Sequence, residues 1–207
     1  MKSSELVYIV DDDAAARDAV SALIGEMGVT AKMYASAEDF LSDYDGHRPA
    51  CLVTDVRMMG MSGVELQEKL ASDGITLSVV VLTAYADTRT TIRAIKGGAV
   101  TLLEKPCRDQ ELWDAIRTAL LEDGKRSRRE AQIVELNLRI QSLAPGERKV
   151  LERIVRGDSN KQMAKRLDVS VRTIEVRRHN VFKKLQADSV AELVKMYLDA
   201  FPDADLR

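Results

Sequence analysis

The sequence predicts an α/β protein in which a doubly wound, five-stranded parallel sheet is followed by a small all-α domain. Over residues 1–121, five short apolar runs alternate with amphipathic helical stretches, the pattern of repeated βα units. Only helical stretches follow. Charge divides the chain at the same place: 12 Lys and Arg against 19 Asp and Glu give a net charge of −7 before residue 122, and 19 against 14 give +5 after it. The basic second part predicts a nucleic-acid surface.

Each predicted strand is a short run of apolar or β-branched residues. The runs are residues 6–10, residues 30–34, a third run that ends at Asp55, residues 78–83 and residues 100–104. Helices are predicted between them from apolar spacings of three and four residues. Residues 14–27 form the first, with Gly28 as its stop. Ser36, Ser62 and Asp87 begin the next three helices, and residues 108–121 form the last helix of this domain.

The cysteines and the apolar runs exclude several classes of protein. Cys51 and Cys107 form no CxxC pair and match no zinc spacing, so we interpret both as small core residues in a reducing compartment. The sequence shows no N-terminal apolar signal and no run of about 18 apolar residues. We therefore expect neither export nor a membrane span, and we expect a cytoplasmic location.

Polar side chains gather at the predicted carboxyl ends of four strands, where parallel α/β sheets bind their ligands. These residues are Asp11, Asp12, Asp55, Thr83 and Lys105. Three crowded carboxylates repel one another unless a cation neutralises them, and a hard ion such as Mg²⁺ suits oxygen ligands. Lysine and threonine at the same edge can hold the oxygens of a phosphoryl group that moves onto Asp55. Taken alone, residues 11–13 are also compatible with a loop that caps the next helix.

The motifs Val10-Asp11-Asp12, Thr54-Asp55-Val56-Arg57-Met58, Leu82-Thr83-Ala84 and Glu104-Lys105-Pro106 resemble the flavodoxin-like receiver domain of bacterial two-component response regulators. The resemblance covers residues 5–121. It implies that a histidine kinase phosphorylates Asp55 and that Thr83 and Lys105 contact the phosphoryl oxygens. It also implies that Asp11, Asp12, Asp55 and the backbone carbonyl of Arg57 hold Mg²⁺. The bond before Pro106 is expected to be cis.

Three positions depart from the receiver pattern. Leu102 stands where the family usually has an aromatic residue that moves together with the threonine, so the switch pair here is Thr83 and Leu102. Met59 replaces a usual proline and predicts a more flexible loop after Asp55. Cys107 also replaces a frequent aromatic residue. Phosphorylation chemistry is expected to be intact, whereas its readout can be weaker or differently triggered.

Residues 122–142 are predicted to form a helical linker. Basic residues at 125–129 resemble a linker by charge, and apolar residues then recur at steps of three and four. The members of this apolar stripe are Ile133, Leu136, Ile140 and Leu143. A helix that packs on one of the two domains and a dimer-forming connector are both compatible with this pattern.

Residues 143–207 are predicted to contain a helix-turn-helix. The predicted helices are residues 145–156, 160–167, 171–185 and 190–201, and the tail from Pro202 is expected to be disordered. A tight turn at residues 168–170 separates the second helix from the third, for which Ser170 is the predicted cap. A net charge of +7 over residues 143–186, from 12 basic and 5 acidic residues, favours DNA over a protein ligand.

This second region resembles the LuxR-type DNA-binding domain, on residues that include Leu143, Pro145-Gly146-Glu147, Val169-Ser170 and Thr173-Ile174-Glu175. With a receiver in front, the chain is similar to the FixJ subfamily. Ala144 replaces a usual threonine cap, and Arg177 replaces a usual histidine. The residues expected at base edges are Glu175, Val176 and His179, and those expected at phosphates are Lys161, Arg172, Thr173, Arg177, Lys183 and Lys184.

The leading hypothesis is a transcription regulator that binds double-stranded DNA and is phosphorylated by a histidine kinase. It is not expected to be an enzyme with turnover. The resemblance implies a homodimer on activation, with Ile92 and Lys96 on the dimer face, and RNA polymerase is kept as a candidate partner. One alternative is a regulator of the same fold that ignores phosphorylation. Another is an aspartyl-phosphate phosphatase, which Arg57 disfavours because such enzymes usually carry a second aspartate at that position.

Overall fold

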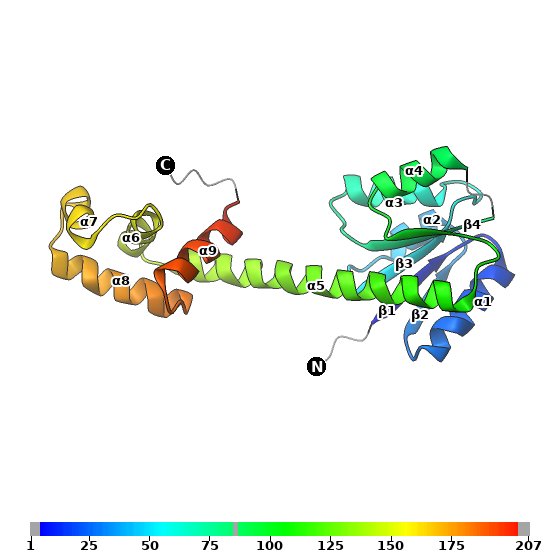
Figure 1. Ribbon diagram of the computed structural model, residues 1–207, viewed down its shortest axis with the longest axis horizontal. Helices are drawn as coiled ribbons and strands as arrows, with labels where there is room; N and C mark the ends of the chain where they lie inside the picture. The colour runs from blue at the N-terminus through cyan, green and yellow to red at the C-terminus, as the bar shows by residue number, and fades with distance from the viewer. Residues whose placement is uncertain (1–4, 85–86, 203–207) are drawn as a thin grey trace. The chain divides into compact units, whose positions relative to one another are not determined.

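The computed structural model describes residues 5–84 and 87–202 of the chain. Its first unit contains one five-stranded sheet with the order β2-β1-β3-β4-β5, and every neighbouring pair is parallel (Figure 1). The strands are β1 (Leu6–Val10), β2 (Thr30–Tyr34), β3 (Ala50–Asp55), β4 (Ser78–Thr83) and β5 (Thr101–Glu104). The strand order reverses between β1 and β3, the position where doubly wound sheets carry their ligands. The predicted fold class is confirmed.

Helices cover both faces of the sheet. They are α1 (Ala14–Glu26), α2 (Ala37–Asp43), α3 (Gly63–Ser72), α4 (Thr88–Lys96) and the first part of α5 (Asp109–Gln141). On one face, α1 and α5 pack against alternate residues of the central strands, such as Ile9 and Val53. On the other face, α2, α3 and α4 pack against the residues between them, such as Tyr8 and Leu52. Both faces of β1, β3 and β4 are therefore buried, as near-continuous apolar runs predict.

The start signals read from the sequence act as caps. The side chains of Ser36, Ser62 and Asp87 accept hydrogen bonds from backbone N–H groups in the first turns of α2, α3 and α4. Gly28 follows α1 with φ of 70°, a conformation that suits glycine. The expected cis bond between Lys105 and Pro106 is present, and a second cis bond joins Arg48 to Pro49.

The predicted end of the last receiver helix is wrong. Instead of stopping near residue 121, α5 continues without a break to Gln141. The chain divides into compact units at residues 128 and 129, inside this helix. Buried Asp123 helps to hold the first unit's share of the helix, because it accepts hydrogen bonds from Arg48 Nε at 2.7 Å and from the Ala50 N–H at 2.9 Å. The linker is helical, as predicted, but it is continuous with the last receiver helix instead of following its end.

The second unit is all-α around its own core. After α5, its helices are α6 (Pro145–Val155), α7 (Asn160–Leu167), α8 (Val171–Leu185) and α9 (Val190–Ala200). Leu136 and Ile140 of α5 are buried in this core with Leu143. Of the two interpretations of the stripe, the structure therefore supports a helix that packs on one domain.

The tail that was expected to be disordered begins at Pro202. Residues 203–207 of the tail lie outside the described residues. Within the described ranges, no helix has the combination of length and apolar character that crossing a membrane requires.

Candidate functional sites: an acidic pocket and a basic helix

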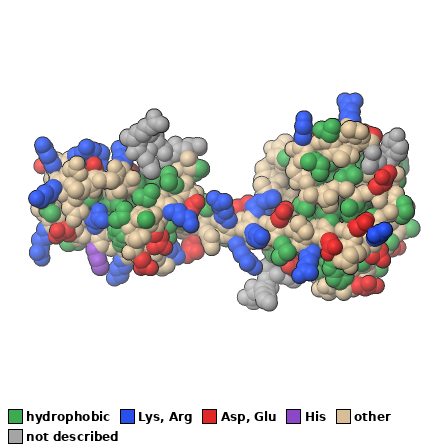
Figure 2. Space-filling model, in the orientation of Figure 1, with side chains coloured by type: hydrophobic (Ala, Val, Ile, Leu, Met, Phe, Trp, Pro, Cys, Tyr) green, Lys and Arg blue, Asp and Glu red, His purple; other side chains and the backbone are tan. Residues whose placement is uncertain are grey.

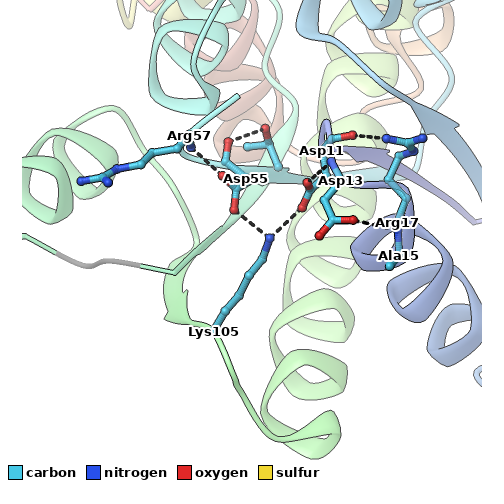
Figure 3. A network of polar contacts seen from close by, with 8 residues as sticks. Asp11, Asp13, Ala15, Arg17, Asp55, Arg57 and Lys105 are labelled. Atoms are coloured by element: carbon cyan, nitrogen blue, oxygen red, sulfur yellow. Dashed lines mark hydrogen bonds and ion pairs between the residues drawn. The ribbon is translucent and has the colours of Figure 1, made fainter. Parts of the chain in front are cut away.

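The predicted acidic residues of the first unit converge on one lysine. Asp11 follows β1, Asp55 ends β3 and Lys105 follows β5, so the parallel strands deliver all three to the same sheet edge. The Nζ of Lys105 lies 2.7 Å from Asp11 Oδ2 and 2.7 Å from Asp55 Oδ1 (Figure 3). One ammonium group therefore faces two carboxylates that come from strands far apart in sequence.

Backbone groups hold the same carboxylates from other directions. The Arg57 N–H donates to Asp55 Oδ2 at 2.5 Å, and the Asp13 N–H donates to Asp11 Oδ1 at 2.9 Å (Figure 3). Both carboxylates are buried, with Asp11 5% and Asp55 8% exposed. Burying a carboxylate is costly unless it is paired and hydrogen-bonded. These contacts satisfy that condition and fix the orientation of Asp55.

The carboxylates next to Lys105 stabilise the protonated form of its side chain. Burial alone disfavours the ammonium form, but the hydrogen bonds to Asp11 and Asp55 outweigh it, so the pKa of Lys105 is raised above its ordinary value. The lysine is therefore a fixed positive charge at neutral pH. Such a charge suits an anionic group bound at Asp55.

The remaining predicted pocket residues differ in exposure. Thr83 is fully buried at the end of β4, and its carbonyl accepts the Lys105 N–H at 2.7 Å. Leu102 on β5 is half-buried and packs against the core on the α4 side of the sheet. Asp12 is exposed, and its Oδ2 accepts the N–H of Met59 at 2.9 Å. This last contact draws Asp12 towards the loop after β3.

The pocket has oxygen ligands of the type that Mg²⁺ takes in proteins. In residues 5–84 and 87–202, no three acidic, His or Cys side chains are already gathered into a metal-binding cluster. The amine of Lys105 neutralises only part of the charge of Asp11 and Asp55, because one ammonium group faces two carboxylates. The residue types at this edge fit a hard divalent cation, with Asp12 as the carboxylate that contacts Met59.

The second unit presents a basic, solvent-facing helix. On α8, Ile174, Val181 and Leu185 are buried as predicted, which leaves the opposite face outward. The predicted DNA contacts that are exposed on α7 and α8 include Lys161, Arg172, Glu175, Val176, His179 and Lys183. Lys and Arg side chains gather on the surface of this unit in the space-filling view (Figure 2). Ser170 caps α8 by accepting the Thr173 N–H at 3.1 Å.

Three predicted DNA contacts already have partners inside the unit. The Thr173 hydroxyl lies 2.8 Å from Ser170 Oγ. Arg177 is half-buried, and its guanidinium lies so close to Gly146 of α6 that a Cβ added there would be 2.8 Å from Arg177 Cζ. Lys184 donates from Nζ to Glu147 Oε2 at 2.6 Å. These contacts give the three side chains structural roles in addition to the predicted one.

Sequence reasoning missed Glu147 as the partner of Lys184. Glu147 is 6% exposed, and its Oε2 also accepts the Ala144 N–H at 2.9 Å. That hydrogen bond is half of a capping box and survives although Ala144 has no hydroxyl. The spacing of three residues between Ala144 and Glu147, which is typical of a capping box, was the sequence signal for this contact. The interaction with Lys184 lowers the pKa of Glu147 below its ordinary value despite burial.

The predicted dimer-face residues lie on α4. Ile92 is 48% exposed, and Lys96 at the end of the helix is exposed as well. The cysteines are free; Cys51 is buried in the core and Cys107 is half-buried. Cys51 is thus a core residue as predicted, whereas Cys107 lies at the edge of the core. Burial raises the pKa of both thiols.

Comparison with known proteins separates the same two regions. Residues 7–117 match the response regulator receiver domain, and residues 141–197 match the luxR family of bacterial regulatory proteins. The chain is 39% identical to the response regulator protein TmoT of Ectopseudomonas mendocina, over 92% of this chain and 87% of that protein. It is 37% identical to the transcriptional regulatory protein FixJ of Bradyrhizobium diazoefficiens, over 94% and 95%.

Solved structures give the same result. The response regulator StyR, at 36% identity, aligns with a TM-score of 0.84 over 94% of this chain and 98% of that one. Full-length FixJ from B. japonicum, at 37% identity, aligns with a TM-score of 0.57 over 94% and 96%. The fold and the two sites define a transcriptional response regulator, a receiver joined to a DNA-binding domain. Within that class, the chain belongs to the FixJ-type family. Control by phosphorylation is typical of this family.

Proposed function

We propose that Asp55 accepts a phosphoryl group from a histidine kinase and that this modification controls promoter binding by the C-terminal domain. The observation that carries the proposal is the pair of 2.7 Å contacts from Lys105 Nζ to Asp11 and Asp55. A carboxylate oxygen of Asp55 forms the new P–O bond while the bond between phosphorus and the kinase's histidine nitrogen breaks. The kinase recovers its histidine, and this chain carries an acyl phosphate.

Catalysis of this step is mostly positioning and charge neutralisation. Lys105 and Thr83 contact the equatorial oxygens of the transferred group, and the Arg57 N–H holds Asp55 in place. Asp11, Asp12, Asp55 and the carbonyl of Arg57 would hold Mg²⁺, which would neutralise charge on the phosphoryl oxygens. We assign no turnover activity to the chain, since the phosphoryl group stays on Asp55 until it hydrolyses.

Phosphorylation controls DNA binding through a change in the first unit that pairs two copies of the chain. Phosphorylation draws Thr83 towards the new group and repacks Leu102, which changes the surface of α4 and brings Ile92 and Lys96 into a homodimer interface. Two copies then present α8 to the major groove of double-stranded DNA, with Glu175, Val176 and His179 at base edges. RNA polymerase is the candidate downstream partner. The setting is the cytoplasm, and no membrane contact is needed.

Acetyl-phosphate labelling with Mg²⁺ tests the acceptor. Wild type is expected to take up one phosphoryl group and Asp55→Asn none, whereas Asp73→Asn, which alters an exposed aspartate on α3's end, is expected to label normally. Equal labelling of wild type and Asp55→Asn contradicts the proposal. Mass spectrometry of the intact chain measures the mass increment directly.

A second candidate is a family member whose DNA binding ignores phosphorylation. Leu102 favours it, because this half-buried aliphatic side chain stands where an aromatic residue usually couples to the threonine. The two candidates differ in one measurement, the oligomeric state and DNA affinity with and without beryllofluoride and Mg²⁺. Unchanged values in a chain that still accepts phosphate support the second candidate.

A further inference from the structure

The loop between β3 and α3 borders the pocket and is held by two acidic side chains from elsewhere in the first unit. Asp12 Oδ2 accepts the N–H of Met59 at 2.9 Å, and Glu38 Oε1 of α2 accepts the N–H of Met61 at 3.1 Å. The loop therefore has specific anchors. The flexibility that the absence of a proline predicts is opposed by these two hydrogen bonds.

The first anchor depends on the residue type at position 59. A proline, usual there in receivers, has no N–H and cannot donate to Asp12. The side chain of Met59 is 82% exposed, so it buries little apolar surface in this arrangement. The contact that this position makes with the pocket is therefore made by its backbone amide.

We propose that the backbone amide of Met59 is a positioning donor for Asp12 in the Mg²⁺ site. A carboxylate has two oxygens, and a donor fixed on one of them orients the other for the cation. Here Oδ2 takes the amide and Oδ1 is assigned to the cation. The inference rests on the proposed function, since it requires Asp12 to be a ligand.

The arrangement links the cation to the loop. Asp12 keeps the loop closed through the amide and holds the cation with its other oxygen, so each contact favours the other. Hydrogen bonds to a charged acceptor are stronger than neutral ones, and outer contacts of metal ligands typically change metal affinity by about 10- to 100-fold when removed. Loss of this single N–H is therefore expected to be measurable.

Mg²⁺ titration of three full-length chains tests the proposal, with binding followed by backbone amide shifts in NMR spectra. Met59→Ala keeps the N–H and is expected to bind Mg²⁺ as wild type does. Met59→Pro removes it and is expected to bind about 10-fold more weakly. Unchanged or tighter binding by Met59→Pro overturns the proposal, as does an equal loss in Met59→Ala.

Two further variants separate the causes. Asp12→Asn is expected to lose Mg²⁺ affinity; if it does not, the proposed ligand set itself fails. If Asp12→Asn loses affinity and Met59→Pro does not, only the role of the amide fails. Glu38→Ala releases the loop at Met61 while leaving the Met59 amide in place, and it is expected to bind Mg²⁺ within about threefold of wild type, well short of the outer-contact range. A loss as large as that of Met59→Pro assigns the effect to loop position in general and overturns the proposal.

Hydrogen exchange gives a readout that needs no proline. The Met59 amide is expected to exchange at least several-fold faster in Asp12→Ala than in wild type, while the Met61 amide changes little. Equal exchange of Met59 in both chains overturns the proposal even if Met59→Pro does not fold.

Discussion

Each of the two units sets a lysine against a buried carboxylate, yet the surroundings of the two pairs differ. In the receiver, Lys105 faces two carboxylates, Asp11 and Asp55, at an edge where ligands bind. In the DNA-binding unit, Lys184 faces one carboxylate, Glu147, which also receives the N–H of Ala144. The second pair joins α8 to the start of α6 and is balanced in charge. The receiver cluster keeps an excess negative charge.

The comparison shows how the same side-chain chemistry serves binding in one place and folding in the other. A cluster with one ammonium for two carboxylates has capacity for a further cation. A matched pair has none, and its value lies in holding two helices together. Exposed basic residues such as Lys161 and Lys183 are a third case, since their charge is available to DNA phosphates.

The largest effect is expected from Lys105. Lys105→Met leaves Asp11 and Asp55 without their shared ammonium and removes the proposed contact to the phosphoryl group, so phosphorylation by acetyl phosphate should fall by about 100-fold or more. Lys69→Met is the matched control, because Lys69 pairs with Asp73 in an exposed i,i+4 position. Labelling rates followed by intact mass measure both. A Lys105→Met labelling rate within a few-fold of wild type would contradict the prediction, because Lys105 would then matter no more than the control Lys69.

The next effect separates Lys184 from its neighbour. Lys184→Met leaves Glu147 buried without its cation and should lower the local unfolding free energy of the second unit by about 1–3 kcal/mol. Lys183→Met changes an exposed side chain and should stay within about 0.5 kcal/mol. Native-state hydrogen exchange of amides in α6 and α8 reports the difference. Equal stabilities would assign Lys184 to the DNA surface alone.

Base and phosphate contacts on α8 should differ in kind. Glu175→Ala is expected to relax preference at one base pair by about 1–3 kcal/mol. Lys183→Met is expected to weaken binding to all sequences alike and to reduce the salt slope of log K by about 1. Sites selected from random duplexes, titrated at several salt concentrations, measure both quantities. A salt slope that Lys183→Met leaves unchanged removes Lys183 from the phosphate contacts.

The smallest effect concerns pH. The folded pKa of Glu147 lies below its unfolded value of about 4.3, mainly because of the hydrogen bond from Lys184. The associated stability is present above that unfolded value and is lost as pH falls through the lower folded pKa. In a pH series of hydrogen exchange, Glu147→Gln should lack this acid-dependent loss in α6. The same loss in the variant would point to another group.

The sequence predicted the architecture closely. The bounds expected for β1, β2, β4, α7 and α8 are those of the structure. Strand ends and caps are local signals, so Asp55, Thr83 and Ser170 could be placed without coordinates. The end of α5 could not, because the local pattern of a charged helical linker does not say whether it continues the helix before it. Tertiary partners such as Arg48 for buried Asp123 hold the helix past residue 121.

The sequence by itself determined where strands end, where helices begin and which helix faces are apolar. The reason is that apolar periodicity and cap spacing depend only on residues close together in the chain. Only the tertiary structure decided which charges meet. Lys105 lies 50 positions from Asp55, and Lys184 lies 37 from Glu147. Packing of the sheet and of the helices brings these groups within hydrogen-bonding distance, and that distance sets whether a lysine neutralises a carboxylate, orients it or remains available to DNA.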